Sequence, residues 1–510
     1  MTPRQDETSF PQPVHFIGIG GTGMSGIALV LHQLGVRVQG SDLKEYRYTR
    51  MLAAAGVPVA IGHREENLGE AAVVVVSSAI PRHNPELRAA ERRGIPVLRR
   101  AEMLARLMAE RRGISVAGTH GKTTTSSMVS HVLHCCGLAP TYVIGGELND
   151  MGSNAGAGQG EWLVAETDES DGSLLYLRPE VAAVMNLEMD HHANYRTLDE
   201  IRDVFRRFVA LLPEHGRLVL VEGGDVDFLR DETRAAVTTV GIGRGDWQAE
   251  VVRVDPVSAE FTVRRHGEDL GRVRLKVGGE HNVLDALACI ATVDYCGVGF
   301  ADAARCLATF SGAARRFDEI GRPRGVLVYD DYSHHPTEVE AAIRSAKLGD
   351  YRRVIAVFQP HLYSRTRYLQ RELGKALTLA DEAVVTDVCG AREEPEPGIT
   401  GKLVVDAYLQ ERPGGPVYYM PRKSDAVRFL ARHAEPGDLV LTLGCGDVYT
   451  IADDLVALLG RDDLAATEED EALRPVAAAR PAPDVTGGGD RSAGGTAPRR
   501  GQGDTAARGE

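Results

Sequence analysis

A glycine turn followed by a lysine and threonines lies in the stretch Ile114 to Gly137. Residues Gly118 to Thr124 read GTHGKTT between an apolar run and a helix-forming run. This order predicts a strand, a turn and a helix, whose backbone N–H groups and positive dipole end bind phosphate. Lys122 would contact the β and γ phosphates, and the Thr123 hydroxyl would contact Mg²⁺. The alternative is an ordinary turn with a solvated lysine, because Val116 stands where the general P-loop pattern has glycine.

Acidic and imidazole side chains follow two further strands. EWLVAETDESDGS places Glu166 near a strand end, and VAAVMNLEMDHH places His191 after the next strand. The carboxyl ends of parallel strands form the ligand-binding edge of a sheet, so Thr123, Glu166 and His191 should converge there. Mg²⁺ takes oxygen ligands, and one imidazole among them is unusual. Taken alone, an acid or a histidine at a strand end is more often solvated or capping.

A second glycine-rich turn opens the chain. VHFIGIGGTGMSGIALVLHQLG reads as strand, turn and helix, and VRVQGSD follows as a strand that ends at Ser41 and Asp42. A dinucleotide-binding fold begins in this way and uses such an acid to bind a ribose hydroxyl. An NAD-dependent dehydrogenase is therefore one hypothesis for this stretch. A tight turn without any ligand is the other.

The elements that position these residues alternate between strand and helix, which predicts an α/β fold. A chain of 510 residues exceeds the size of a single core, and we expect three domains. They are a Rossmann-like domain at 1–112, a central P-loop-type ATPase domain at 113–313, and a Rossmann-like domain with a four-stranded parallel sheet at 314–465. The tail 466–510 is poor in aromatic and large aliphatic residues, so we expect it to be disordered.

Composition and charge limit the function classes. The net charge of −14 argues against a nucleic-acid-binding protein, which needs a basic face. The first residues carry acids and no apolar core, and no apolar run reaches the roughly 18 residues of a membrane span. Seven cysteines without a CxxC pattern predict neither a disulfide framework nor a zinc site. These features together predict a cytoplasmic protein without membrane insertion.

The motifs as a set resemble those of the Mur ligases, ATP-dependent carbon–nitrogen ligases of peptidoglycan synthesis. They are GIGGTGMSGIA, GSD, SSAI, AGTHGKTTT, ETDESD, NLEMDH, GEHN, RRFD, DDYSHHPTEV, FQPH and TLGCGDV, in family order from residue 14 to about 450. DESD (Asp168 to Asp171) and DDYSHHPTEV favour the branch that adds L-alanine to UDP-N-acetylmuramate. The tripeptide-recycling branch, which tends to read DEYD, is the alternative.

The resemblance implies a mechanism and a division of labour. The first domain would bind the UDP sugar rather than NAD, the central domain would bind ATP, and the third would close over both. The muramyl carboxylate would attack the γ-phosphate to give an acyl phosphate and ADP. The alanine amine would then displace phosphate. ATP and two Mg²⁺ ions are the implied cofactors, and the oligomeric state stays open between monomer and dimer.

The resemblance also assigns residues to roles. The catalytic residues it implies are Lys122, His191, Arg316 and Asp331. The ATP-binding residues are Gly118, Thr119, His120, Gly121, Lys122, Thr123, Thr124, His281, Asn282, Arg316 and Asp331. The UDP-sugar residues are Gly20, Gly21, Thr22, Gly23, Ser41, Asp42 and Ser78. The L-alanine residues are Tyr332, His334, His361 and Arg365, and the metal ligands are Thr123, Glu166 and His191.

Two positions depart from the family pattern. Leu362 stands where many relatives have arginine after the proline and histidine of the FQPH motif, so Arg365 would pair with the alanine carboxylate alone. Asp285 stands where relatives often have asparagine, which leaves the adenine contact open. The segment from His191 to Arg217 contains arginines and no lysine, so we expect no carbamylated lysine as a metal ligand.

Overall fold

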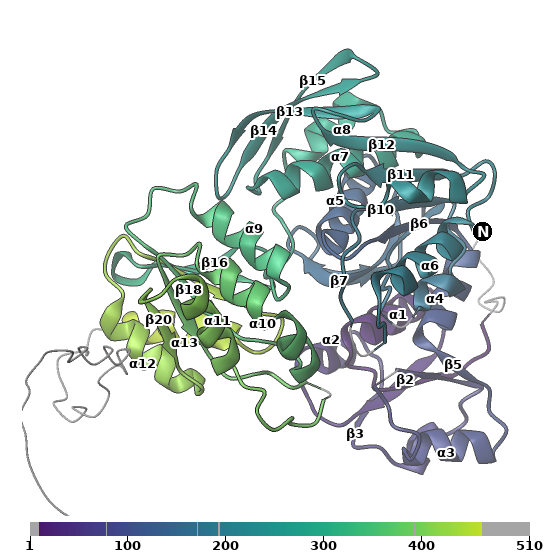
Figure 1. Ribbon diagram of the computed structural model, residues 1–510. Helices are drawn as coiled ribbons and strands as arrows, with labels where there is room; N and C mark the ends of the chain where they lie inside the picture. Colours follow the sequence, from purple (N-terminus) through teal and green to yellow (C-terminus); the bar gives the residue numbers. More distant parts are fainter. Residues whose placement is uncertain (1–9, 78, 171, 192–193, 392, 462–510) are drawn as a thin grey trace, which may run out of the picture. The chain divides into compact units, whose positions relative to one another are not determined.

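The computed structural model describes residues 10–77, 79–170, 172–191, 194–391 and 393–461. Within these residues the chain forms three sheets, each built from one continuous part of the sequence (Figure 1). The prediction of three α/β domains is confirmed. The predicted disordered tail lies outside the described residues. None of the described helices is long and apolar enough to cross a membrane.

The first sheet is parallel, with strand order β3-β2-β1-β4-β5. Its strands are β1 (Val14–Ile17), β2 (Val38–Asp42), β3 (Val59–Ile61), β4 (Val73–Val76) and β5 (Val97–Arg99). Its helices are α1 (Thr22–Gln33), α2 (Arg47–Ala54), the 3-10 helix η1 (Glu65–Leu68), α3 (Pro85–Arg92) and α4 (Arg100–Ala109). The continuous apolar run of β4 suits a strand that is covered on both faces. This is the Rossmann-like order that the sequence predicts.

The central sheet has the order β15-β14-β13-β12-β11-β10-β6-β9-β7-β8. Its strands are β6 (Arg112–Ala117), β7 (Thr141–Leu148), β8 (Ser153–Gly156), β9 (Trp162–Glu166), β10 (Val181–Val184), β11 (Arg217–Val221), β12 (Ala236–Ile242), β13 (Trp247–Val254), β14 (Ala259–Arg265) and β15 (Glu268–Leu275). The helices of this segment are α5 (Lys122–Cys135), η2 (Ser173–Tyr176), α6 (Leu198–Val209), η3 (Asp227–Glu232), α7 (Glu280–Tyr295) and α8 (Phe300–Leu307). The predicted β-rich run corresponds to β11–β15.

Both faces of the central sheet are buried. Along β10, Val181 and Ala183 pack with the helices α5 and α7, whereas Ala182 and Val184 pack with α6. This alternation follows from the period of two in a strand. The strand ends of β6, β9 and β10 are therefore fixed by packing on two sides, and the candidate site lies at those ends.

The third sheet has the order β16-β17-β21-β18-β19-β20. Its strands are β16 (Asp318–Gly321), β17 (Leu327–Asp331), β18 (Val354–Phe358), β19 (Glu382–Val385), β20 (Val417–Tyr419) and β21 (Leu439–Leu443). Its helices are η4 (Pro323–Gly325), α9 (Pro336–Ala346), α10 (Tyr363–Leu377), α11 (Lys402–Glu411), α12 (Lys423–His433) and α13 (Tyr449–Leu459). The prediction of four parallel strands is wrong, because the edge strands β16 and β20 add one antiparallel and one parallel strand. Both are too short to give a clear apolar pattern.

One hydrophobic core joins the first sheet to the edge of the central sheet. Helix α1 packs on β7 and β8, where Val143 and Ala155 belong to the same buried cluster as Ile27. Gly26 permits this close approach, since a Cβ there would lie 3.1 Å from the Cβ of Ala155. The buried clusters of the third domain contain residues of that domain alone.

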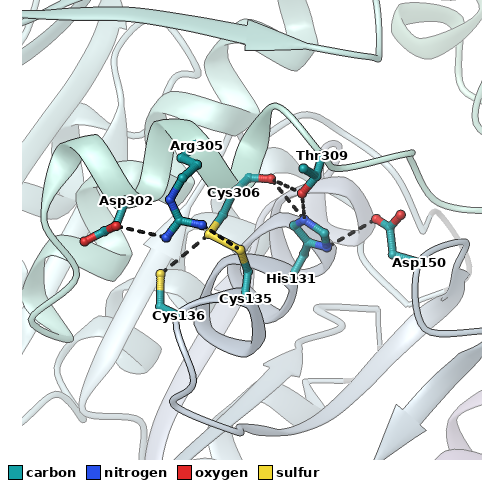
Figure 2. The surroundings of a disulfide bond; sticks show 8 residues. All are labelled: His131, Cys135, Cys136, Asp150, Asp302, Arg305, Cys306 and Thr309. Carbon is teal, nitrogen blue, oxygen red and sulfur yellow. Dashed lines mark hydrogen bonds and ion pairs between the residues drawn. A yellow bond between two sulfur atoms is a disulfide. The ribbon is translucent and has the colours of Figure 1, made fainter.

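Two helices of the central domain are joined by a disulfide between Cys135 of α5 and Cys306 of α8 (Figure 2). The prediction that the cysteines form no disulfide is wrong for this pair. The two residues are 171 positions apart, and only the packing of α5 on α8 brings their Cα atoms to 6.0 Å. The Sγ atom of Cys136 lies 3.6 Å from that of Cys306. The remaining five cysteines are free.

Candidate active site

The loop between β6 and α5 is held in shape by Asn186, which follows β10. The backbone N–H of His120 donates to Asn186 Oδ1 (2.8 Å), and Asn186 Nδ2 donates to the His120 carbonyl (3.1 Å). Gly118 and Gly121 have φ angles of 132° and 81°, which other residues rarely adopt. A Cβ at Gly118 would lie 2.9 Å from the Asn186 carbonyl oxygen. The loop therefore presents the first amides of α5 in a fixed arrangement that suits phosphate.

Lys122 begins α5 and is buried among oxygen atoms. Its Nζ donates to the Gly118 carbonyl (2.5 Å) and to Glu169 Oε2 (3.0 Å). Burial alone would lower the pKa of Lys122, but Glu169, Asp168 and Glu166 raise it above its ordinary value. The lysine is therefore a permanent positive charge at the start of the helix.

The structure brings Thr123 and Glu166 together as predicted from the sequence. The Thr123 hydroxyl donates to Glu166 Oε2 (3.0 Å), and the Gly145 N–H donates to the same oxygen (2.7 Å). His191 instead lies beside Glu169, with its Nε2 3.2 Å from Glu169 Oε1. The three predicted metal ligands thus fall into two neighbouring groups, a Thr123–Glu166 pair and a second group around His191. Asp168, Glu169 and His191 have ligand atoms within 4.8 Å of one another.

A pocket of about 280 Å³ lies beside the loop, between α7 and the start of the third domain. The predicted ATP residues that line it are His120, Gly121, Thr124, His281, Asn282, Arg316 and Asp331. Its apolar lining includes Met185, Leu187, Val221, Pro256, Leu284, Ala341 and Ala342. A cavity with one polar side and one apolar side suits a purine nucleotide.

Asp285 lies directly beneath the loop. A Cβ at Gly121 would lie 2.6 Å from Asp285 Oδ1, so the carboxyl group and the loop are in close contact. Burial raises the pKa of Asp285 to about 7. This side chain changes charge near neutral pH at the place where phosphate would bind.

The third domain contributes Arg316, Asp331 and Tyr332 to the same side of the site. The Asp331 carboxylate accepts hydrogen bonds from the N–H groups of Phe317 (2.8 Å) and Ser333 (2.8 Å), which fix it at the end of β17. The Arg316 guanidinium lies 5.3 Å from the centroid of the Tyr332 ring. These contacts order the loop that follows β17 against the pocket.

The predicted alanine residues form a second cluster around Arg365. The guanidinium of Arg365 binds Asp190 through Nε (3.0 Å) and Nη2 (2.9 Å), and both residues are buried. His361 Nδ1 lies 3.3 Å from Arg365 Nη1, and the His361 and His334 ring centroids are 6.1 Å apart. Burial lowers the pKa of His334 to about 3, so this imidazole is neutral at physiological pH. The carboxylate that Arg365 pairs with here is that of Asp190.

In the first domain, the glycine turn closes on Asp42. The Gly20 N–H (2.9 Å) and the Tyr46 hydroxyl (3.2 Å) both donate to Asp42 Oδ2. Ser41 is fully buried and donates to Glu86 (2.6 Å), which removes its hydroxyl from the surface. The other predicted UDP-sugar residues in this turn and the first turn of α1 are Gly21, Thr22 and Gly23. The predicted Ser78 lies outside the described residues.

Sequence reasoning did not single out two acids that the structure places in the site. Glu169 contacts Lys122 and His191, but it is one of four acids in ETDESD and nothing in that pattern distinguishes it. Glu338 lines the ATP pocket and accepts from the N–H of His334 (3.1 Å) at the start of α9. In the sequence it reads as an ordinary capping residue at the third position of the helix.

Three family models match the chain in succession. They are the Mur ligase family, catalytic domain, at residues 13–112, the Mur ligase middle domain at 116–293, and the Mur ligase, glutamate ligase domain, at 315–446. These matches cover the first sheet, most of the central domain and most of the third.

Named relatives agree with the family models. The chain is 49% identical over 449 residues to a UDP-N-acetylmuramate--L-alanine ligase of Rubrobacter xylanophilus, covering 88% of this chain and 100% of the relative. It is 45% identical over 478 residues to the enzyme of the same name from Saccharopolyspora erythraea, covering 91% and 96%.

Two solved structures share the fold over nearly their whole length. The UDP-N-acetylmuramate-alanine ligase of Thermotoga maritima has a TM-score of 0.75 at 28% identity, covering 87% of this chain and 98% of that one. A murein peptide ligase of Psychrobacter arcticus has a TM-score of 0.68 at 28% identity, covering 89% and 99%. With three consecutive family domains and a relative that is matched from end to end, the chain belongs to the Mur ligase family.

Proposed function

We propose that this chain catalyses the ATP-dependent addition of L-alanine to the carboxylate of UDP-N-acetylmuramate. The names of its relatives support the two substrates, and the geometry of one pocket supports the reaction. A preformed phosphate loop and Arg316 of the third domain line this pocket, and Thr123 of the Thr123–Glu166 pair lies in the first turn of the helix that follows the loop. We propose the cytoplasm, where ATP and nucleotide sugars are made, as its location.

ATP would occupy the pocket with its phosphates on the loop. The first amides of α5 follow Gly121, and the Lys122 ammonium adds positive charge at the same helix end. The apolar lining beside His281 and Asn282 suits the adenine ring. Arg316 and Asp331 would reach the nucleotide from the third domain.

The oxygen donors at the strand ends fit Mg²⁺. Thr123 and Glu166 place a hydroxyl and a carboxylate 3.0 Å apart beside the phosphate loop, which is the donor set this ion prefers. His191 and Glu169 form a neighbouring group that would hold a second ion. Bound Mg²⁺ would neutralise charge on the phosphate oxygens.

The residues of the chain would act mainly by positioning and by neutralising charge. A carboxylate is a poor electrophile, so the sugar acid must first take the γ-phosphoryl group of ATP to form an acyl phosphate. Lys122 and Arg316 would offset the negative charge that accumulates as two anions approach. The alanine amine would then attack the acyl carbon and displace phosphate, with Tyr332, His334, His361 and Arg365 around it. Arg365 would have to share its guanidinium between Asp190 and the alanine carboxylate.

The first domain would bind the UDP sugar at the glycine turn near Gly20. The dehydrogenase hypothesis loses its main support, because both Asp42 oxygens already accept hydrogen bonds, Oδ2 from the Gly20 N–H and Oδ1 from the Leu43 N–H. The tripeptide-recycling alternative differs only in the incoming amine.

An assay of phosphate release tests the proposal. We expect release only when UDP-N-acetylmuramate, L-alanine, ATP and Mg²⁺ are all present, with UDP-muramyl-alanine detected by mass spectrometry. Replacing alanine with the free tripeptide L-alanyl-γ-D-glutamyl-meso-diaminopimelate should stop the reaction. Product with the tripeptide and none with alanine would assign the chain to the recycling branch. Tight NADH binding by the full chain would restore the dehydrogenase hypothesis.

A further inference from the structure

A second cluster of imidazoles and acids borders the pocket proposed for ATP, and His120 is its one member among the predicted ATP residues. It consists of His120 from the phosphate loop, Glu188 from the segment after β10, and His335 just before α9. One ligand atom from each lies within 4.8 Å of the others. Two of these residues belong to the central domain and one to the third.

The ring nitrogens of both imidazoles, His120 and His335, are buried and make no hydrogen bond among the described residues. His335 is 5% exposed. Their ring centroids are 4.6 Å apart. The His120 nitrogens face carboxylate oxygens of Glu338 (3.1 Å) and Glu188 (3.5 Å), whereas Nε2 of the buried His335 has no partner among the described residues. Buried polar atoms almost always have partners, so this nitrogen indicates a missing ligand.

The spacing of the ligand atoms fits a tetrahedral ion. His120 Nε2 lies 3.5 Å and His335 Nδ1 lies 3.6 Å from the same oxygen, Glu188 Oε2. An ion with four ligands at about 2.1 Å holds neighbouring ligand atoms about 3.4 Å apart. Small side-chain movements would therefore place all three atoms around one ion.

The surrounding groups orient these ligands as an outer shell does in known metal sites. Glu338 Oε1 lies 3.1 Å from His120 Nδ1, which leaves Nε2 of the same ring facing Glu188. The Thr337 hydroxyl donates to Glu188 Oε2 (2.6 Å) and fixes the carboxylate. Both Thr337 and Glu338 lie in the first turn of α9.

We propose that His120, Glu188 and His335 form a binding site for a divalent transition metal of the zinc class, separate from the Mg²⁺ groups. Two imidazoles and one carboxylate are a ligand set for Zn²⁺ or Co²⁺, whereas Mg²⁺ prefers oxygen donors. The neighbouring Asp168–Glu169–His191 group differs, because it offers two carboxylates and one imidazole, a set richer in oxygen that suits the proposed Mg²⁺.

An ion at this site would join the two domains. It would bind the phosphate loop and the strand end of the central domain to the start of α9 in the third domain. Three protein ligands leave a fourth position for water or for a ligand group. Metal binding would therefore favour the arrangement in which the third domain lies against the ATP pocket.

Cobalt spectroscopy tests this proposal without any turnover. The full chain, stripped of metal by a chelator and kept unreduced to preserve the Cys135–Cys306 disulfide, is titrated with Co²⁺ in excess Mg²⁺. We expect one equivalent to give the strong visible absorption of tetrahedral Co²⁺, without a thiolate charge-transfer band, and Zn²⁺ to abolish it. Because ATP and sugar are absent, failure here leaves the proposed ligase activity standing.

Substitutions test which residues bind the ion. His335→Asn and Glu188→Gln should each weaken Co²⁺ binding by about tenfold or more. His191→Asn, in the neighbouring group, and His266→Asn, on the exposed β14–β15 turn, should bind as the wild type does. Melting curves recorded without metal identify any variant that fails to fold. If one of His335→Asn and Glu188→Gln does not fold, the metal binding of the other one tests the proposal. Unchanged binding in folded His335→Asn or Glu188→Gln protein, or loss of binding in His191→Asn, would overturn the proposal.

Discussion

Lys122 has a polar environment of its own before any ligand binds, because it donates to a loop carbonyl and to Glu169. The nucleotide would therefore bind to an ammonium group that is already fixed in place. The same is true of Glu166, whose Oε2 accepts from Thr123 and from the Gly145 N–H. At the scale of residues the site is preformed, and single substitutions should separate its parts.

We predict that Lys122→Ala lowers the rate of phosphate release by about a thousandfold, because the charge that offsets the phosphates is lost. UDP-sugar affinity, measured by isothermal titration, should stay within about twofold of wild type, because the glycine turn near Gly20 lies in another domain. A comparable loss of both quantities would show that the two ligands do not bind in separate places.

Glu166→Gln should raise the Mg²⁺ concentration for half-maximal activity by about tenfold, since one charged oxygen donor is removed. Glu161→Gln is the matched control, because Glu161 is an exposed acid just before the same strand. A Mg²⁺ titration of both variants checks this prediction. If the two curves coincide, Glu166 is not a ligand.

Asp285 should make ATP binding depend on pH. Its pKa is raised to about 7 by burial, so the group is neutral below that pH and charged above it. The new negative charge beneath Gly121 should weaken binding of a non-hydrolysable ATP analogue several-fold between pH 6 and pH 8. In Asp285→Asn the affinity for the analogue should not change over this pH range. The same change with pH as in the wild type would show that Asp285 is not the group responsible.

The same group has a stability effect whose sign follows from its pKa. The unfolded chain releases this proton near the ordinary value of 3.8, whereas the folded chain keeps it up to about pH 7. The contribution of Asp285 is therefore full at low pH and is lost as the pH rises toward 7. The free energy of unfolding, measured from denaturant curves, should fall more steeply with rising pH over this window for the wild type than for Asp285→Asn.

At the scale of elements, the strand–loop–helix of the phosphate site could be predicted from the sequence because it is local. The apolar run of β6, the glycines and the helix-forming residues of α5 are neighbours along the chain. The Arg365–Asp190 and Cys135–Cys306 pairs could not be predicted, since each joins residues more than a hundred positions apart through packing alone. The strands β16 and β20 were missed because three or four residues carry no period.

The loop glycines give a test with a close control. Gly121→Ala should impair both folding stability and ATP affinity, because φ is 81° and the new Cβ would lie 2.6 Å from Asp285 Oδ1. Gly137, just beyond α5, has a similar φ of 77° but no atom within 4 Å of a Cβ. Gly137→Ala should therefore lose only about 1 kcal/mol from backbone strain and keep its ATP affinity. Equal effects of the two changes in denaturant and binding curves would show that contact with Asp285 is unimportant.

At the scale of the molecule, the disulfide joins two helices of the central domain, one of which starts at the phosphate loop. We predict five titratable thiols in the denatured, unreduced protein and all seven after reduction. A count of seven without reductant would show that Cys135 and Cys306 are not joined. Reduction should also lower the melting temperature, because a cross-link over so long a loop restricts the unfolded chain.

The buried contact of α1 with β7 and β8 determines how this chain could be recombined with a relative. A chimera that exchanged only residues 1–112 would set a foreign helix against Val143 and Ala155, and a side chain larger than glycine at position 26 would push against Ala155. A crossover placed just before the third domain avoids that problem, because the apolar clusters there are self-contained. Chimeras made to change the amino-acid specificity should therefore fold more often when they exchange the third domain than when they exchange the first.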